Sequence, residues 1–577
     1  MSHNKSNFIP SQKRLDRPSP RVWDVNDLIG YMGTHGDKTV FRYYENGKLK
    51  DMNYTQFYAM CCNVAAGFDK LGLVGKKVAV IGDTSPQWLA TYIGALAAGT
   101  VIIPMDKELD LPEIENFLTM VEADGIVYSK SFNEKFVTTI NNHETLKYFM
   151  PVNAEYDSSF SEKVLPFGDL LSLGQENINN GYKIPMHHNT DEMCEMLFTS
   201  GTTGTSKCVM LSQKNIFATV SSAIETVCFT KDAVIVSVLP VHHTYELMCL
   251  LAAFVLGAEV GINDSLRHVM KNFKLFKPTG LVLVPLFVNT MYKRIWSEAE
   301  RTGRDKALKT ALKTSKALRK VGIDARKRLF ASVTDAFGGR LTNIICGGAK
   351  LNPELIEAFD EFGINICEGF GITECSPLVA VNPYYARKLG SVGPHAPSCR
   401  VRIDPTGEQT EDGYELGEIQ VKGDNVMIGY YNNPVANADV FTNDGWFRTG
   451  DVGYIDSDKY IYITGRIKFV IVLENGKNVF PEEIEEYLTS INTISECCVI
   501  GRKNHDEDEV ILTAVVYPDF TKFPENCDDE TIKETIRKAV NTINKKLPTY
   551  KQIKAVELRK TEFEKTTTKK IKRQLVK

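Results

Sequence analysis

Short apolar runs alternate with helix-like patterns along two long stretches of the chain, and this alternation constrains the fold more than any other feature. In the first stretch, residues 26–130, an apolar run at 77–82 precedes a helical pattern at 86–98. The same rhythm returns between Met193 and Thr373. The further strands expected in these stretches are residues 100–104, 233–238, 280–284 and 342–346. Strands separated by helices predict β-α-β units on parallel sheets, so we expect an α/β fold.

The pattern changes in the last third of the chain. In residues 390–466, short alternating strands at 401–403 and 418–421 are separated by turn residues, which predicts a small antiparallel barrel or sheet. After that, strands and helices mix. The strands expected there are residues 469–473, 497–500 and 511–516, and the helices are 481–488 and 529–545. We therefore expect a large N-terminal domain at 1–467, with two α/β subdomains and the small barrel, followed by a small α+β domain at 468–577.

Composition excludes several classes of protein. At 577 residues, with 43% hydrophobic and 24% charged residues, the chain can build more than one large core. Its formal net charge of −4 gives no reason to expect nucleic acid as a partner. Thirteen cysteines are scattered without a C-x-x-C pair, which disfavours a disulfide framework or a zinc site and favours the cytoplasm. Residues 1–20 lack the apolar run of a signal peptide, and the longest apolar run, 247–258, is shorter than the ~20 residues of a membrane-spanning helix.

A polar loop between two apolar runs is the strongest chemical signal. Residues 199–207, Thr-Ser-Gly-Thr-Thr-Gly-Thr-Ser-Lys, combine hydroxyl groups with two glycines and a lysine. Glycine lets backbone N–H groups approach an anion, and the hydroxyl groups and Lys207 add donors and charge, so the loop suits a polyphosphate. It is not a Walker A loop, because Gly204 lies three residues before Lys207. A flexible linker is the alternative, but the apolar runs at 196–198 and 209–211 favour a strand–loop–strand unit.

One segment is strongly basic. Residues 293–328 carry thirteen Lys or Arg against four acidic residues. Apolar and small residues recur in it at helical spacing: Leu308, Ala311, Leu312, Ser315 and Leu318. A solvated surface helix with a basic outer face explains this pattern. The alternative is a helix at 297–328 that contacts anionic lipid headgroups as a peripheral membrane surface.

Four segments occur in a characteristic order. They are residues 199–207, then Gly369-Phe370-Gly371-Ile372-Thr373-Glu374, then Gly445-Trp446-Phe447-Arg448-Thr449-Gly450-Asp451 with Thr464-Gly465-Arg466, and finally Lys565-Thr566-Thr567-Thr568-Lys569-Lys570-Ile571-Lys572-Arg573. Any one of them is a weak signal, but with all four in order the chain resembles the adenylate-forming (ANL) superfamily of acyl-CoA synthetases, luciferases and peptide-synthetase adenylation domains. The resemblance covers nearly the whole chain. It is greatest to the long-chain fatty acyl-CoA synthetases, because of Pro240-Val241-His242-His243-Thr244-Tyr245-Glu246, the basic segment and the Thr-Thr-Thr-Lys-Lys ending.

This resemblance implies a reaction in two steps. A fatty acid carboxylate would attack the α-phosphate of ATP to give an acyl-adenylate and pyrophosphate, and coenzyme A would then take the acyl group as a thioester. Several negative charges meet in the first step, so cationic and hydrogen-bond donors must be in place beforehand. Mg²⁺, a hard cation that prefers oxygen ligands and phosphate, would be the cofactor and would be held by Glu374.

The resemblance also assigns a nucleotide site. The residues that would bind the phosphates are Thr199, Ser200, Gly201, Thr202, Thr203, Gly204 and Lys207. The residues that would lie around the adenine are Gly348, Ala349, Glu368, Gly369 and Phe370, with Thr373 in the same set. Asp451 would accept hydrogen bonds from the ribose hydroxyls, and Arg466 would donate near the same ribose. Thr199 is also a catalytic candidate.

The C-terminal segment would supply the catalytic lysine. Lys570 is a compact charge that could neutralise the carboxylate and α-phosphate oxygens as they approach each other. The chain departs from the family here, because Lys569 stands where the family has glycine, so neighbouring lysines compete for the role. A disordered basic tail is the alternative. By the resemblance, the small domain is mobile, Lys468 is its hinge, and the loop with Gly476 lines a passage for the coenzyme A thiol.

The acyl site is expected around His243, a third catalytic candidate, at the mouth of the pocket and near the substrate carboxylate. Residues 247–256 and 281–288 could line an apolar tunnel, because burial of each methylene at ~0.8 kcal/mol favours long chains. Amino-acid-activating relatives carry an aspartate just after the corresponding aromatic residue, and this chain does not. Glu246 is the one residue of this segment that could pair with the ammonium group of an amino acid substrate, so that substrate class is disfavoured but not excluded.

Two other functions remain open at this point. The first is an acyl-AMP ligase that loads an acyl carrier protein, which we would expect to be a separate chain. The second, from a different class, is a non-catalytic acyl- or nucleotide-binding relative, although every motif position holds a chemically competent residue.

Overall fold

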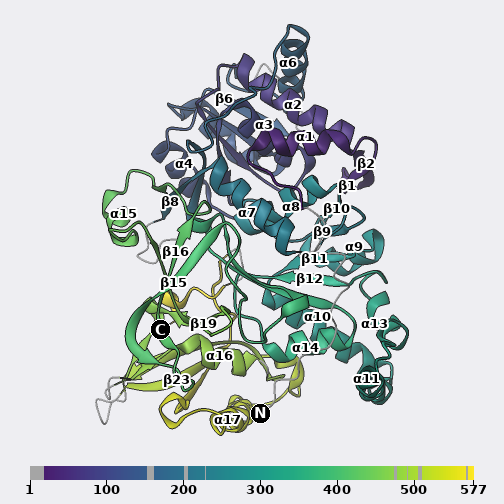
Figure 1. Ribbon diagram of the computed structural model, residues 1–577, viewed down its shortest axis with the longest axis vertical. Helices are drawn as coiled ribbons and strands as arrows, with labels where there is room; N and C mark the ends of the chain where they lie inside the picture. The colour runs from purple at the N-terminus through teal and green to yellow at the C-terminus, as the bar shows by residue number, and fades with distance from the viewer. Residues whose placement is uncertain are drawn as a thin grey trace.

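The chain builds two large sheets in the upper and middle parts of the molecule and smaller units at its lower end (Figure 1). The structure, a computed structural model, describes residues 19–152, 161–199, 206–227, 229–473, 477–489, 491–503, 510–566 and 570–576.

The first large sheet has seven strands. In spatial order they are β17 (Gly429–Tyr430), β8 (Lys207–Ser212), β7 (Met193–Thr199), β4 (Val101–Met105), β3 (Lys77–Ile81), β5 (Gly125–Ser129) and β6 (Tyr148–Val152). Strands β7, β4, β3, β5 and β6 pair in parallel, whereas β8 and β17 continue the sheet in antiparallel fashion. The parallel β-α-β units predicted for 77–104 are confirmed.

The second large sheet has eight strands. In order they are β14 (Leu378–Asn382), β13 (Asn365–Gly371), β12 (Asn343–Cys346), β11 (Gly280–Leu283), β9 (Val234–Ser237), β10 (Glu259–Ile262), β1 (Thr39–Glu45) and β2 (Lys48–Asn53). Its six inner strands are parallel and its two edge strands are antiparallel. Parallel inner strands place their carboxyl ends at one edge of the sheet, which is where ligands bind in open α/β sheets.

Helices cover both sheets. Those of the N-terminal part are α1 (Val25–Thr34), α2 (Tyr54–Lys70), α3 (Pro86–Ala98), α4 (Leu111–Met120), α5 (Asn133–Asn142), α6 (Phe167–Asn179), α7 (Gln213–Thr226), α8 (Thr244–Leu256), α9 (Val269–Phe276), α10 (Pro285–Arg301), α11 (Asp305–Lys320), α12 (Arg326–Leu329), α13 (Ala331–Asp335), α14 (Pro353–Glu361) and α15 (Pro434–Val440). Helix α8 is apolar on all sides and almost entirely buried, so it belongs to the core between the sheets. Gly257, in a left-handed conformation with φ of 71°, ends it.

Among the described residues, three smaller sheets and the helices α16 and α17 complete the fold. The four-stranded antiparallel sheet contains β15 (Cys399–Gln409), β16 (Glu415–Gly423), β18 (Phe447–Ile455) and β19 (Ile461–Arg466). The C-terminal part contains β20 (Ile471–Val472), β21 (Asn478–Val479), α16 (Pro481–Thr489), β22 (Ile494–Lys503), β23 (Val510–Pro518), α17 (Asp529–Asn544) and β24 (Ala555–Leu558). It has its own buried cluster, formed by α16, α17 and the sheet of β22, β23 and β24.

Two expectations need correction. The strand expected at 469–473 is wrong for most of its length, because a short 3₁₀ turn at Ile467–Phe469 precedes the two-residue strand β20. The basic segment is not one helix but the end of α10 followed by α11 and α12, with turns between them. The periodicity within α11 is confirmed, since Ser315 is buried and Leu308, Ala311 and Leu312 pack against the core. Contact of this segment with lipid stays a prediction.

Within the described ranges, no helix is both long enough and apolar enough to span a bilayer.

Candidate active site

Strands β7 and β8 frame the polar loop, as the strand–loop–strand prediction requires. Thr199 and Lys207 are paired across the two strands, and the Thr199 hydroxyl donates to the Lys207 carbonyl at 3.3 Å. The loop residues Ser200, Gly201, Thr202, Thr203 and Gly204 lie outside the described residues. Lys207 is the first residue of β8, and its side chain lies against Tyr430 of strand β17.

A chain of contacts connects Lys207 to the predicted magnesium ligand. The Lys207 ammonium lies 4.7 Å from the centre of the Tyr430 ring, and the Tyr430 hydroxyl donates to Glu374 Oε1 at 2.8 Å. Glu374 is half-buried in a short 3₁₀ turn that begins at Thr373, and its carbonyl accepts from the Met427 N–H at 2.8 Å. The sequence analysis did not identify Tyr430, because only the tertiary fold brings it to Glu374 from 56 positions away.

Asp451 and Arg466 form an ion pair on neighbouring strands. They are partners in the β18–β19 register, and Arg466 Nε lies 2.7 Å from Asp451 Oδ1. Asp451 is only 3% exposed, and its burial raises the pKa of its carboxyl although Arg466 opposes this. Its second oxygen, Oδ2, has no hydrogen-bond partner among the described residues. A buried carboxylate oxygen with free acceptor capacity suits the hydroxyl groups of a ligand.

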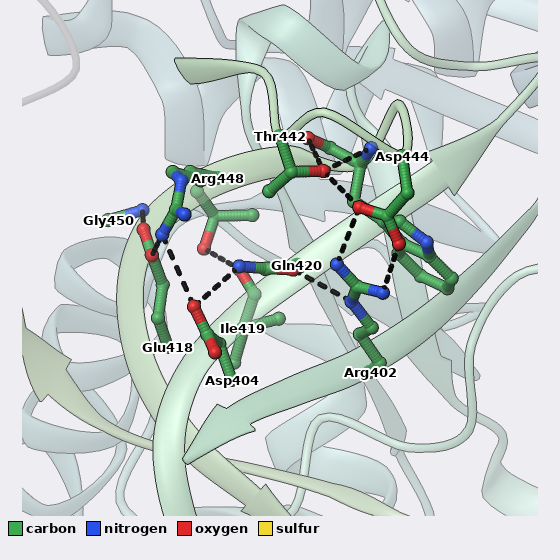
Figure 2. Close-up of polar contacts among 11 residues, drawn as sticks. Arg402, Asp404, Glu418, Ile419, Gln420, Thr442, Asp444, Arg448 and Gly450 are labelled. Carbon is green, nitrogen blue, oxygen red and sulfur yellow. Dashed lines mark hydrogen bonds and ion pairs between the residues drawn. The ribbon is translucent and has the colours of Figure 1, made fainter. Parts of the chain in front are cut away.

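A polar network on the four-stranded sheet supports the strand that carries Asp451 (Figure 2). Glu418 of β16 accepts from the Gly450 N–H at 3.0 Å and from Arg448 at 3.1 Å. The Thr449 hydroxyl donates to the Ile419 carbonyl at 2.7 Å. Gly450 has φ of 72°, a conformation that favours glycine, so the motif Arg-Thr-Gly-Asp bends at Gly450 just before Asp451.

The other members of this network extend it across the sheet: Arg402, Asp404, Gln420, Thr442 and Asp444. They tie β15, β16 and the turn before β18 together. The network therefore fixes the backbone of the strand just before Asp451, whose side chain is paired with Arg466.

Lys570 reaches this site from the C-terminal end of the chain. The Thr566 N–H donates to the Lys570 carbonyl at 2.8 Å, and the Lys570 N–H donates to the Thr566 hydroxyl at 3.2 Å, so Thr566 holds the backbone of the lysine. Lys570 is an exposed residue, but the protein atoms around its ammonium exclude part of the solvent. This desolvation and the charge of Arg466 lower the pKa of Lys570 to about 8, although the Asp451 carboxylate opposes the shift. Lys468 also faces Asp451, and burial lowers the pKa of Lys468.

His243 lies at the N-terminal end of α8 and close to the charge of Lys570. Burial lowers the pKa of His243 to about 3, with His242 and Lys570 acting in the same direction. The rings of His242 and His243 are 4.1 Å apart. At neutral pH His243 is therefore an uncharged imidazole, which can exchange hydrogen bonds with a carboxyl group but does not supply a positive charge.

An apolar cavity lies among the residues expected around adenine. Its walls come from α7, α8 and the strands β12, β13 and β14. Lining residues on α8 are Tyr245, Met248, Cys249, Ala252 and Leu256. The predicted tunnel wall at 247–256 is thus in contact with the cavity, whereas 281–288 is not. Residues 281–288 are all described and none lines the cavity; Leu281, Leu283 and Val288 pack into a separate buried cluster instead.

Most of the residues expected around adenine also line the cavity. Gly348, Glu368, Gly369 and Phe370 line it. Gly348 has φ of 87°, and Ala349 follows it as an exposed residue. Burial raises the pKa of Glu368 to about 8.

Glu246 does not face the cavity. Ser237 donates a hydrogen bond to its carboxyl group, and burial raises the pKa of Glu246 to about 8. Glu246 therefore offers no ionised partner for the ammonium group of an amino acid. The predicted passage residue Gly476 lies outside the described residues.

In the two-step reaction that the sequence resemblance implies, the pH dependence of the first step is expected to report the ionisation of Lys570. Because the pKa of Lys570 lies at about 8, kcat/KM for carboxylate-dependent pyrophosphate release is expected to fall as the pH rises through that value. We expect no change in kcat/KM near pH 6.5 from the titration of a histidine, because the pKa of His243 is lowered to about 3. Pyrophosphate release without coenzyme A, measured from about pH 6 to 10, checks this. The Lys570→Arg variant stays protonated, so an unchanged alkaline limb in that variant would contradict the assignment.

Comparison with known proteins places most of the chain in two family profiles. The profile of the AMP-binding enzyme family matches residues 31–431, and that of the AMP-binding enzyme C-terminal domain matches residues 468–577. The chain is 26% identical over 563 residues to the long-chain-fatty-acid–[acyl-carrier-protein] ligase AEE15 of Arabidopsis thaliana, covering 86% of this chain and 76% of that protein. It is 26% identical over 482 residues to the long-chain-fatty-acid–CoA ligase FadD15 of Mycobacterium bovis, covering 81% of this chain and 78% of that protein.

A solved structure shares the fold. The adenylation domain of a carboxylate reductase from Mycobacterium chelonae superposes with a TM-score of 0.79 at 19% identity, covering 98% of this chain and 91% of that one. With more than half of its length matched by the family profile, the chain belongs to the AMP-binding enzyme family and is an adenylate-forming ligase with an acyl-CoA synthetase-like fold.

Proposed function

We propose that the protein activates a long-chain fatty acid with ATP and transfers the acyl group to coenzyme A. The observation that carries this proposal is the apolar cavity lined by α7 and α8, whose lining also includes the adenine-binding candidates Gly348, Glu368 and Gly369. An aliphatic chain would lie among Met248, Ala252 and neighbouring apolar residues, with its carboxylate toward the nucleotide. Each buried methylene stabilises such a complex by ~0.8 kcal/mol, so the cavity favours aliphatic acids over short polar ones.

In the first step, a carboxylate oxygen attacks the α-phosphorus of ATP, and the bond from that phosphorus to the bridging oxygen of pyrophosphate breaks. Lys570 offsets the negative charge that gathers on the carboxylate and α-phosphate oxygens, and neutral His243 orients the carboxylate. Asp451, paired with Arg466, accepts hydrogen bonds from the ribose hydroxyl groups of the nucleotide. Thr199 and Lys207 lie at the two ends of the phosphate loop.

A magnesium ion fits the donors at this site. Among the described residues, no group of three or more His, Cys, Asp or Glu is gathered that could hold a metal ion by itself. Mg²⁺ is commonly bound by one or two carboxylates together with the phosphates of a nucleotide, and Glu374 offers one such carboxylate, positioned by Tyr430. When bound, the ion would neutralise the phosphate charge.

The second step needs a different arrangement of the C-terminal part. A coenzyme A thiolate attacks the acyl carbonyl, the acyl–phosphate bond breaks, and AMP leaves. We take residues 1–467 and 468–577 as the two domains, Lys468 as the hinge, and Gly476 as part of the thiol passage. The short 3₁₀ turn at Ile467–Phe469, between β19 and β20, supports a hinge there, because a few residues outside regular structure can absorb backbone rotation.

The molecule that accepts the acyl group, coenzyme A or an acyl carrier protein, distinguishes the main proposal from a second one. The Arabidopsis relative is named as a ligase for acyl carrier protein and the mycobacterial one as a coenzyme A ligase, at the same identity. Loading of a carrier protein is therefore the second candidate. A cytoplasmic location stays a prediction.

Pyrophosphate release over a panel of fatty, aromatic and amino acids tests the proposal. We expect release to be greatest with fatty acids of long chain, and thioester to form with free coenzyme A. Transfer only to an acyl carrier protein would support the second candidate. Carboxylate-independent or absent pyrophosphate release would contradict both.

A bulky residue in the cavity should shorten the accepted chain. In the Ala252→Phe variant, the ring would displace about three methylenes at ~0.8 kcal/mol each, which corresponds to a roughly 50-fold lower kcat/KM for a long-chain acid. Activity with butyrate should stay near that of the wild type, which also shows that the variant folds. Equal losses for long and short acids would place the acyl chain elsewhere.

A further inference from the structure

Helix α16 of the C-terminal part contacts the nucleotide-binding face at two points. Glu486 Oε2 lies 2.8 Å from the ammonium of Lys350, which directly follows the Gly348-Ala349 bend. Glu482, one turn earlier on the same side of α16, lies against β19, where its Oε2 would be 3.0 Å from a Cβ atom added to Gly465. Figure 1 shows α16 beside β19. Two contacts one helical turn apart define both the position and the tilt of α16 against the larger part of the chain.

The same helix holds the segment that carries Lys570. Glu485 forms an ion pair with Arg573, three residues after Lys570, and Arg573 also donates to the Val499 carbonyl at 3.3 Å. Arg573 therefore moves together with α16. A displacement of α16 from Lys350 would displace Lys570 from Asp451.

Of the acidic residues near Lys350, Glu486 is the one that pairs with it. Burial alone would lower the pKa of Lys350, but the neighbouring Glu486 outweighs it and the pKa is raised. Glu483, the other acid of α16 nearby, is paired with Lys551 at 2.6 Å. Glu368 lies near Lys350 as well, but its pKa is raised to about 8, so it is mostly neutral at pH 7 and does not compete. The Lys350–Glu486 pair lies at the surface on one side only, with the Lys350 side chain 36% exposed and the Glu486 side chain 14% exposed.

We propose that Lys350 is a positioning residue for acyl-adenylate formation: its ion pair with Glu486 holds α16 against the nucleotide-binding face, and α16 holds Lys570 in the site. This inference rests on the proposed function, because it assigns Lys570 to the first step. It predicts that the pair matters for adenylation and not for thioester formation, in which Lys570 leaves the site.

The test is a double-mutant cycle on the two half-reactions. In Lys350→Met and in Glu486→Gln, kcat for carboxylate-dependent ATP–pyrophosphate exchange is expected to fall about five- to tenfold, with the KM for ATP little changed. The double variant should lose no more than either single one. Thioester formation from supplied acyl-adenylate and coenzyme A should stay within about twofold of wild type, and Lys350→Arg should retain exchange.

A matched control separates this role from a structural one. Lys551→Met also removes the cationic partner of an acid on α16, but that pair does not connect α16 to Lys350, so the ratio of the two half-reactions should stay unchanged. Equal loss of both half-reactions in Lys350→Met, additive losses in the double variant, or a raised KM for ATP at unchanged kcat would overturn the inference.

A measurement without turnover separates failure of this inference from failure of the proposed function. A zero-length carbodiimide should join Lys350 to Glu486 in the wild-type protein, and mass spectrometry would identify the cross-linked peptides. Absence of this cross-link would overturn the inference alone. Absence of carboxylate-dependent exchange in the wild type would contradict the proposed function, whatever the cross-link shows.

Discussion

Replacing Lys570 by alanine is expected to lower the rate of acyl-adenylate formation by about 100- to 1,000-fold. The ammonium lies close to Asp451, Arg466 and His243, and Thr566 holds the backbone of Lys570 by hydrogen bonds. Without it, the carboxylate and the α-phosphate oxygens would approach each other with their charges less compensated. Pyrophosphate exchange with a long-chain acid measures this step.

The same variant should still convert supplied acyl-adenylate to thioester, because Lys570 has no role in that step. The matched control is Lys572→Ala, which removes an exposed lysine two residues away and should leave both steps unchanged. A Lys569→Ala variant decides between the neighbouring lysines, since Lys569 lies outside the described residues. Equal loss of both half-reactions in Lys570→Ala would refute the assigned role.

Replacing Glu374 by glutamine is expected to lower ATP-dependent activity by about 100-fold, with weak rescue by excess Mg²⁺. The amide keeps the shape of the side chain and can still accept from the Tyr430 hydroxyl, but it removes the negative charge that would hold the ion. A magnesium titration of pyrophosphate release measures the effect as a raised requirement for Mg²⁺.

Tyr430→Phe is the control for this prediction. It keeps the ring that faces Lys207 and removes only the hydroxyl group that donates to Glu374. We expect a smaller loss, about tenfold, because the carboxylate stays but is less well oriented. Unchanged activity and unchanged magnesium requirement in Glu374→Gln would remove Glu374 from the metal site.

Local patterns along the chain were sufficient to predict much of the fold. The helix at 86–98 was predicted at its observed bounds, because Ser85 accepts from the Trp88 N–H at the start and Gly99 adopts a left-handed conformation at the end. Strands such as β3 and β9 were found because inner strands of a parallel sheet are apolar throughout. The length of strand β20 was overestimated: a strand was predicted at 469–473, but only Ile471 and Val472 form one. An apolar run does not show how many of its residues pair with a neighbouring strand.

The candidate site was only partly predictable. Asp451 and Arg466 stand in one motif, and the register of β18 and β19 brings them together as that motif suggests. The cavity wall opposite α8 was assigned to 281–288, whereas β13, β14 and the end of α7 provide it. Periodicity identifies a buried segment, but it does not show which of the buried elements face a cavity and which face the core.

The sequence by itself determined the α/β class, the four motifs of an adenylate-forming enzyme and the identity of the residues that could carry charge in the reaction. Those features depend on residue type and on spacing over a few positions, which the chain encodes directly. Only the tertiary structure decided that Tyr430 orients Glu374, that Glu246 is removed from the acyl site, and that Lys350 pairs with Glu486. Each of these depends on contacts between side chains distant in sequence, whose distance and burial follow from how the sheets and α16 pack together.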